Sequence, residues 1–345
     1  MCKSLNWDGW MNSESGYGIV NLEYATALIR AGIDVSCEWE RQENVTADSF
    51  NKLTEEQQKF LLKPFKKEKI GIIKTTPELF NKCTSEFRIG YSMVENTQVG
   101  ERWIRWCNDM DMMFVPSAYL IDVFKESGMK KPIISVKQGI DSRKFPYVER
   151  RPQRKFIFGT VGYQDDRKNW QDLVKAFCSE FDGNEPVELW IKNTNGYWIA
   201  KEFSDERVRI INRMYTFEEV QKLYTYFDCF VFPSHAEGSG LPPREAMATG
   251  LPVILTNWSG LTEIADPSIS YPLTPVAIDH PDVRGIEQPG FMARLDVTEL
   301  MYWMRYVYDH QGEAKEKGKK ASLFIHKNYS WDACVSDMIK KLEAI

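Results

Sequence analysis

The chain has 345 residues, of which 43% are hydrophobic and 13% aromatic, and its formal net charge is −5. This composition can fill sizeable cores, and the length suits two α/β domains because a single core stops growing at about 250 residues. Nucleic-acid-binding proteins usually carry a basic surplus, so the acidic balance disfavours a polynucleotide partner. The composition therefore predicts a two-domain globular protein and excludes a largely disordered chain.

The first half of the chain alternates predicted strands and helices. Residues 4–7 and 33–39 have strand patterns, and 19–31 places its apolar residues on one helical face after a glycine-bearing loop. Further strands are expected at 70–74, 87–92, 112–117 and 132–139. Helices are expected at 118–127 and at 53–69, and the second of these has a basic end. This alternation predicts a parallel sheet covered on both faces.

The same pattern restarts after the basic segment 143–155, which we interpret as a linker between domains. Strands are expected at 156–162, 187–192, 208–212, 229–234 and 252–256, and helices at 168–181, at 217–227 and through Met247. Thr216 and Glu219 have the spacing of a capping box. The second half therefore predicts a second parallel sheet.

The cysteines and the ends of the chain bear on its compartment. Seven cysteines are scattered without a CxxC pair or a histidine at metal-site spacing, as is typical of reduced thiols. No N-terminal segment has the form of a signal peptide, and the longest uncharged run, 112–121, is far shorter than the ~18 residues of a membrane span. We expect a cytoplasmic protein without a transmembrane segment or a bound metal, with peripheral membrane contact left open.

A glycine-rich turn, 237-EGSGLPP-243, follows one of the predicted strands. The turn is therefore expected at the edge of the sheet where the carboxyl ends of the strands lie, and doubly wound α/β proteins bind ligands at that edge. Gly238 and Gly240 lack side chains that would block a ligand, so the backbone amides from Gly238 to Leu241 can face an anion. Because the two prolines suit the first turn of a helix, the sequence predicts a diphosphate seat at a helix N-terminus.

A diphosphate also needs cations, since the helix dipole contributes only ~0.3–1 kcal/mol at an exposed site. Arg167 and Lys168 follow the first strand of the same half, and each charge-assisted hydrogen bond would add roughly 1.5–3 kcal/mol. Alternatively, both cations pair with Asp165 and Asp166 on the surface.

Two glutamates flank the glycine turn. Glu245 lies about one turn into the predicted helix, where a carboxylate can accept hydrogen bonds from ribose hydroxyls. Glu237 precedes the turn and can hold a polyhydroxylated group attached to the phosphates. This arrangement suits a nucleotide sugar. Alternatively, Glu245 is a favourable first-turn charge and Glu237 an ordinary loop carboxylate.

The string 233-PSHAEGSGLPPREAMATGLPVI-254 strongly resembles the signature of the family 4 retaining glycosyltransferases of GT-B fold. The order of segments 7–18, 116–141, 215–224 and 329–345 is also similar to that family, so the likeness covers nearly the whole chain. A string of the form EGxGLPxxEAMAxGxPV is far more specific than a bare GxG.

The resemblance implies a GT-B fold, in which two Rossmann-like, doubly wound parallel-sheet domains face a cleft. The N-terminal acceptor domain would comprise 1–150, with the helix 329–345 packing back on it, and the C-terminal donor domain would comprise 151–328. The resemblance also implies donor contacts at Gly16, Gly18, Arg167, Lys168, Met214, Thr216, Glu237, Gly238, Gly240, Leu241 and Glu245. Among these, Glu237 would contact the sugar, Glu245 the ribose and Lys168 the diphosphate.

Some positions depart from the family pattern. Tyr163 stands where an arginine often follows the glycine that ends the first C-domain strand, and Arg167 is the candidate to replace that arginine. Ser239 stands where an aromatic residue is common, and Arg244 where the residue is usually apolar. The histidine frequent at an N-domain strand end is missing, and Glu95 is the nearest candidate for its role.

The resemblance implies a metal-free, retaining glycosyltransferase that needs no cofactor and uses a nucleotide-diphospho-sugar as donor. A carbohydrate or another hydroxyl compound would be the acceptor, and Glu237, Lys168 and Glu95 are the predicted catalytic residues. The alternative is a catalytically silent GT-B subunit that binds a nucleotide sugar or a glycan, because a fold alone never settles activity.

Overall fold

A computed structural model describes residues 3–12, 15–37, 47–150, 154–163, 165–193, 205–213, 215–279 and 289–344. The chain divides into two compact units. The first comprises Met1–Val94, Gln98–Gly139 and Tyr329–Ile345, and the second comprises Glu95–Thr97 and Ile140–Asn328. The second unit thus begins before the segment 143–155 that we interpreted as a linker, and before the predicted boundary at residue 150.

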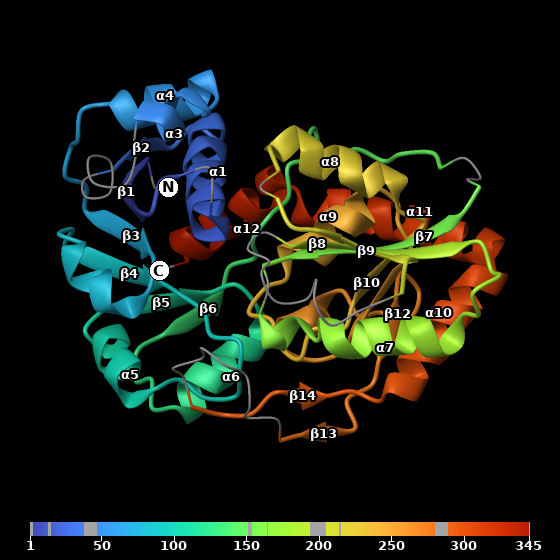
Figure 1. Ribbon diagram of the computed structural model, residues 1–345. Helices are drawn as coiled ribbons and strands as arrows, with labels where there is room; N and C mark the ends of the chain where they lie inside the picture. The colour runs from blue at the N-terminus through green and yellow to red at the C-terminus, as the bar shows by residue number, and fades with distance from the viewer. Residues whose placement is uncertain are drawn as a thin grey trace. The chain divides into compact units, whose positions relative to one another are not determined.

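The first unit contains a six-stranded parallel sheet with the order β2-β1-β3-β4-β5-β6 (Figure 1). Its strands are β1 (Ser4–Gly9), β2 (Asp34–Ser36), β3 (Ile70–Lys74), β4 (Phe87–Tyr91), β5 (Met112–Val115) and β6 (Ile133–Ser135). The chain order reverses between β1 and β3, which pair in parallel. In a doubly wound sheet such a reversal is the place where ligands bind.

Helices cover both faces of the first sheet, because parallel strands need crossover connections. On one face Tyr24 of α1 (Gly16–Arg30) packs between Trp7 of β1 and Trp331 of α12 (Trp331–Glu343), with ring centroids 4.8 and 4.9 Å away. The other face packs against η1 (Pro77–Lys82), α5 (Glu101–Asn108) and α6 (Ala118–Glu126). Two further helices are α3 (Ala47–Asn51) and α4 (Glu55–Leu62).

Two helix boundaries differ from the sequence-based expectation. Helix α1 begins at Gly16 rather than after residue 18, because the Ser15 hydroxyl caps it by accepting a hydrogen bond from the Gly18 amide at 3.0 Å. Helix α4 ends at Leu62, so most of the basic stretch up to residue 69 is not helical. The reason is Pro64, which disfavours a helical conformation of the residue before it.

The second unit contains another six-stranded parallel sheet, ordered β12-β11-β10-β7-β8-β9. Its strands are β7 (Phe156–Gly162), β8 (Val187–Asn193), β9 (Val208–Ile211), β10 (Cys229–Phe232), β11 (Val253–Thr256) and β12 (Tyr271–Leu273). A short antiparallel pair, β13 (Ala277–Ile278) and β14 (Ala293–Arg294), lies outside it. Read from β9, the order is that of a Rossmann fold, and the reversal falls between β7 and β10.

The second sheet is also covered on both faces (Figure 1). Helices α7 (Trp170–Glu180) and α10 (Val297–Asp309) bury one face against Phe158, Leu189 and Val231. Helices α8 (Phe217–Tyr226) and α9 (Leu241–Ala248) lie on the other face (Figure 1), where Gly159 leaves room for the ring of Phe227. The expectation of two Rossmann-like parallel sheets is therefore confirmed. No helix among the described residues is long and apolar enough to span a membrane.

Helix α11 (Gln311–Tyr329) packs closely on the turn that follows α9. A Cβ atom at Gly318 would overlap the carbonyl oxygen of Gly250, whereas a Cβ at Gly312 would meet nothing within 4 Å. The side chain of Ser322, one turn further on, donates a hydrogen bond to the Ala248 carbonyl at 2.6 Å.

We expect Gly318→Ala to lower the free energy of unfolding by about 1–3 kcal/mol, because overpacking outweighs the higher helix propensity of alanine. Gly312→Ala in the same helix is the matched control and should leave stability unchanged or raise it by up to about 1 kcal/mol. Urea unfolding monitored by circular dichroism measures both, and equal effects of the two substitutions would contradict the packing argument.

Candidate functional site

The glycine turn lies where the strand order of the second sheet reverses. Strands β7 and β10 pair in parallel, so the segments that follow them meet at the carboxyl edge of the sheet. The segment after β7 supplies Arg167 and Lys168, and the segment after β10 supplies Glu237. The predicted convergence of these three residues is what the structure shows.

The two cations lie in a short turn, whereas the helix expected at 168–181 would have included Lys168. Asp165 caps the 3-10 turn η2 (Asp166–Lys168) by accepting a hydrogen bond from the Arg167 amide at 2.9 Å. Asn169 then adopts a left-handed conformation with φ of 54°, and helix α7 begins only at Trp170. This break separates the cations from the helix and lets both side chains reach Glu237.

Glu237 accepts three polar contacts on one carboxylate oxygen. Its Oε1 lies 2.5 Å from Lys168 Nζ and 2.7 Å from Arg167 Nη1. The hydroxyl of Ser234 donates to the same oxygen at 2.7 Å. All these side chains are buried, so the alternative of surface pairing is wrong, although Arg167 does keep Asp165 as a second partner at 3.3 Å.

The charges in this cluster hold Glu237 ionised. Burial alone raises the pKa of Glu237, but the charges of Arg167 and Lys168 outweigh it and hold the pKa below its ordinary value. For Lys168 burial dominates and lowers the pKa, with Glu237 opposing it. A buried carboxylate of this kind can accept hydrogen bonds from ligand hydroxyls, while the cations beside it favour phosphate.

The glycine turn presents backbone donors as expected. No described residue accepts a hydrogen bond from the amides of residues 238–241. The turn is fixed from outside, because Ser259 Oγ accepts from the Glu237 amide and the Gly260 amide donates to the Glu237 carbonyl, both at 2.9 Å. Gly240 has φ of 79°, which favours glycine, and both prolines lie in the first turn of α9. The arrangement suits an anion.

Ser239, inside the turn, and Arg244, on α9, are hydrogen-bond partners. Arg244 is completely buried, and its Nη1 donates to Ser239 Oγ at 2.5 Å. Its Nη2 lies 3.5 Å from the Glu263 carboxylate. A buried guanidinium needs such acceptors, and Ser239 and Glu263 supply them.

Glu245 has a partner that sequence reasoning missed. The hydroxyl of Tyr224, on α8, donates to Glu245 Oε2 at 2.8 Å. Burial raises the pKa of Glu245 to about 7, although the Tyr224 hydrogen bond opposes the shift. The capping box of Thr216 and Glu219 locates α8 in the sequence, but no sequence signal shows that Tyr224 faces α9.

The remaining predicted site residues are placed as follows. Glu95 groups with the second unit, and its pKa is raised by burial and by Glu237, while Arg167 opposes the shift. Gly16 and Gly18 lie in the first unit, at the start of α1. Thr216 is exposed and caps α8, and Met214 lies outside the described residues.

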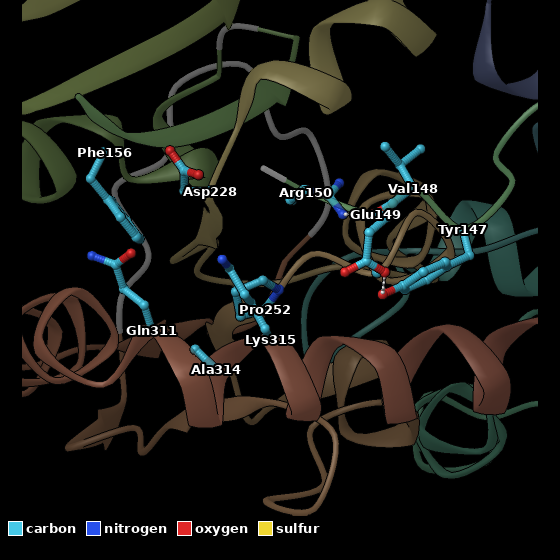
Figure 2. Close-up of a pocket in the computed structure, with 11 residues that line it drawn as sticks. Tyr147, Val148, Glu149, Arg150, Phe156, Asp228, Pro252, Gln311, Ala314 and Lys315 are labelled. Carbon is cyan, nitrogen blue, oxygen red and sulfur yellow. Dashed lines mark hydrogen bonds between the residues drawn. The ribbon is translucent and has the colours of Figure 1, made fainter. Parts of the chain in front are cut away.

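The amino edge of the second sheet carries a separate pocket (Figure 2). It contains the half-buried Arg150, whose guanidinium donates to the carbonyl oxygens of Thr249 at 2.6 Å, Phe227 at 3.1 Å and Tyr224 at 3.2 Å. These bonds tie the chain entering β7 to the helices α8 and α9. Arg150 is thus structural, and the carboxyl edge remains the better candidate site.

The described residues contain no group of three or more His, Cys, Asp or Glu side chains able to hold a metal ion. This observation does not test whether the reaction needs a metal ion, so the expectation that it needs none stays a prediction.

Comparison with known proteins places this site in a family context. Residues 155–278, most of the second unit, match the family model described as "Glycosyl transferases group 1". A glycogen synthase of Mycobacterium tuberculosis is 25% identical over 244 residues, covering 67% of this chain and 53% of the relative. The O-antigen chain mannosyltransferase B of Escherichia coli is 30% identical over 121 residues, covering 30% and 29%. The chain spans about half the length of the glycogen synthase it matches.

Solved structures show the same fold. The sucrose-phosphate synthase of Thermosynechococcus elongatus has a TM-score of 0.70 at 14% identity, covering 99% of this chain and 98% of that one. HepE of Anabaena, solved in complex with UDP and glucose, has a TM-score of 0.68 at 12% identity and full coverage of both chains. The chain therefore has the α/β architecture of the GT-B glycosyltransferases, as the sequence predicted.

The two glutamates should affect stability oppositely as the pH changes. Folding raises the pKa of Glu245 from 4.5 to about 7, so its contribution is present below pH 4.5 and is lost as the pH rises through about 7. We expect the wild type to weaken relative to Glu245→Gln over that interval. Folding lowers the pKa of Glu237, so its contribution is present above 4.5 and is lost in acid.

Urea unfolding across the range from about pH 4 to pH 8 measures these differences. The stability advantage of the wild type over Glu237→Gln should shrink as the pH falls below 4.5, the reverse of the Glu245→Gln trend. Parallel curves for the two variants would contradict the assigned protonation states.

Proposed function

We propose that the chain is a retaining, metal-independent glycosyltransferase that moves a sugar from a nucleotide-diphospho-sugar to an acceptor hydroxyl. The observation that carries this proposal is the meeting of Arg167, Lys168 and Glu237 where the strand order of the second sheet reverses. Beside them lie the four backbone amides of residues 238–241, which find no acceptor in the described parts of the chain. Such a site offers donors to a diphosphate and an ionised carboxylate to a polyol.

The diphosphate would lie against the amides of residues 238–241 and take charge-assisted hydrogen bonds from Lys168 and Arg167. Each of these bonds contributes roughly 1.5–3 kcal/mol, more than the ~0.3–1 kcal/mol of the helix dipole. The resemblance places an arginine at the position of Tyr163, whose side chain is exposed. In this proposal Arg167 takes the role of that arginine. Glu237 would accept hydroxyls of the donor sugar, and Glu245 hydroxyls of the ribose.

In the proposed reaction, the acceptor oxygen forms a bond to the anomeric carbon on the face from which the diphosphate leaves. The bond between that carbon and the phosphate oxygen breaks, and the acceptor proton passes to the leaving phosphate oxygen. The chain's own task is positioning and charge stabilisation: Arg167 and Lys168 offset the negative charge that grows on the diphosphate. Glu95, whose pKa is raised by burial, is the remaining predicted catalytic residue of this proposal.

The comparisons support this class of reaction. The matched relatives carry the names of a glycogen synthase and a mannosyltransferase, and HepE was solved with UDP and glucose. A silent binding subunit would also bind a nucleotide sugar but would release no nucleoside diphosphate. Incubating the protein with a panel of nucleotide sugars and carbohydrate acceptors, and measuring that release, separates the two functions.

We expect Lys168→Ala to weaken UDP binding roughly 10- to 100-fold and nearly to abolish release of nucleoside diphosphate, because a charge-assisted contact to the phosphates is lost. Glu237→Ala should nearly abolish release as well. Lys175→Ala, which removes an exposed lysine from helix α7, is the matched control and should behave as the wild type. Calorimetric titration with UDP gives the affinities, and wild-type turnover in Lys168→Ala would remove its assigned role.

We also expect EDTA to leave the rate of transfer unchanged, because the two cations take the role that a divalent metal ion plays elsewhere in stabilising the leaving diphosphate. The measurement compares initial rates with and without chelator at constant ionic strength. A large loss of rate that added Mg²⁺ or Mn²⁺ restores would refute the metal-free reaction.

A further inference from the structure

A second reversal of strand order carries a buried cation that the donor site does not use. In the first sheet the order reverses between β1 and β3, and Gly9 and Lys74 are the paired residues at the carboxyl ends of these strands. Gly9 permits this close arrangement, because a Cβ there would overlap the Lys74 carbonyl oxygen. Lys74 therefore lies at the position where doubly wound sheets bind ligands.

The ammonium group of Lys74 has no anionic partner within the described part of the chain. Lys74 is 1% exposed, and no described residue accepts a hydrogen bond from its Nζ. The group lies 4.1 Å from the centre of the Tyr17 ring and 5.3 Å from that of Tyr91. Burial lowers the pKa of Lys74 to about 7, with no opposing contribution from a carboxylate.

The aromatic rings do not account for this burial. Cation–π contacts contribute about 0.5–2 kcal/mol, whereas desolvating an ammonium costs several kcal/mol. The described residues include two other buried lysines, and each of them has an oxygen acceptor. Lys168 donates to Glu237 at 2.5 Å, and Lys192 donates to the Asn193 carbonyl at 2.9 Å. Lys74 differs from both, and a buried polar group without a partner in a folded protein requires an explanation.

Unpaired hydroxyls lie at the same edge of the first sheet. Thr75 directly follows β3, Ser92 directly follows β4, and Ser117 follows β5. All three are buried, and their hydroxyl oxygens have no hydrogen-bond partner among the described residues. Ser117 is also the N-cap of α6, yet its side chain makes no capping bond. A cation and several free donors at one sheet edge favour a negatively charged ligand.

We propose that the carboxyl edge of the first sheet binds an anionic group, a phosphate or a carboxylate, carried by the acceptor substrate, and that Lys74 supplies its counter-charge. The inference rests on the proposed function, because transfer needs a second substrate besides the donor, which is assigned to the second unit. The half-buried ring of Tyr17 lies over Nζ, and it is the side chain that an arriving anion displaces.

Calorimetric titration of the full chain with its donor site saturated by UDP tests the proposal. One arm uses inorganic phosphate and the other glucuronate, which separates phosphate from carboxylate recognition. We expect at least one anion to bind, and Lys74→Met to weaken that binding at least 10-fold. Methionine keeps an apolar stem under Tyr17 and removes an uncompensated charge, so the variant should fold. Thermal unfolding checks this.

Lys125→Met, which removes an exposed lysine from α6, is the matched control and should bind the anion as the wild type does. The inference is overturned if neither anion binds to the UDP-loaded wild type, or if Lys74→Met binds as tightly as the control. Failure of UDP itself to bind would refute the proposed donor site instead, so the first titration distinguishes the two failures.

Discussion

The buried contact of Glu237 with Arg167 and Lys168 is the interaction on which the carboxyl edge of the second sheet depends. Two buried cations depend on the carboxylate between them, because removing Glu237 would leave buried positive charge uncompensated at a cost of several kcal/mol. The contact also joins segments 69 residues apart, Lys168 after β7 and Glu237 after β10. It therefore holds together the two chain segments that form the candidate donor site.

Further polar partners fix the parts of that site which a ligand would touch. Arg244 holds Ser239 inside the glycine turn, and Tyr224 holds Glu245 on the adjacent helix. Because these partners are buried, the donors and acceptors are oriented before a ligand arrives, and less conformational entropy is lost on binding.

The points where the strand order reverses in the two sheets differ in how the charge of a buried lysine is offset. At the reversal point of the second sheet, Glu237 supplies the counter-charge of Lys168, so the charge of this lysine is offset without a ligand. At the first, Lys74 has aromatic rings for neighbours and no carboxylate partner among the described residues. Burial lowers the pKa of both lysines, but only Lys168 has its charge offset by a carboxylate of the described chain. This difference is why we propose that an anionic group of a substrate offsets the charge of Lys74.

The sequence by itself determined the two parallel sheets, since strand and helix patterns depend on local periodicity, and it located the glycine turn through its prolines and glycines. It also predicted Glu237 and Lys168 as site residues, and their role stays a prediction. Tertiary structure alone decided that both cations meet one oxygen of Glu237, because that depends on the pairing of β7 with β10 and on the left-handed Asn169. The isolation of Lys74 was likewise invisible in the sequence, because a missing partner is a property of the packed surroundings.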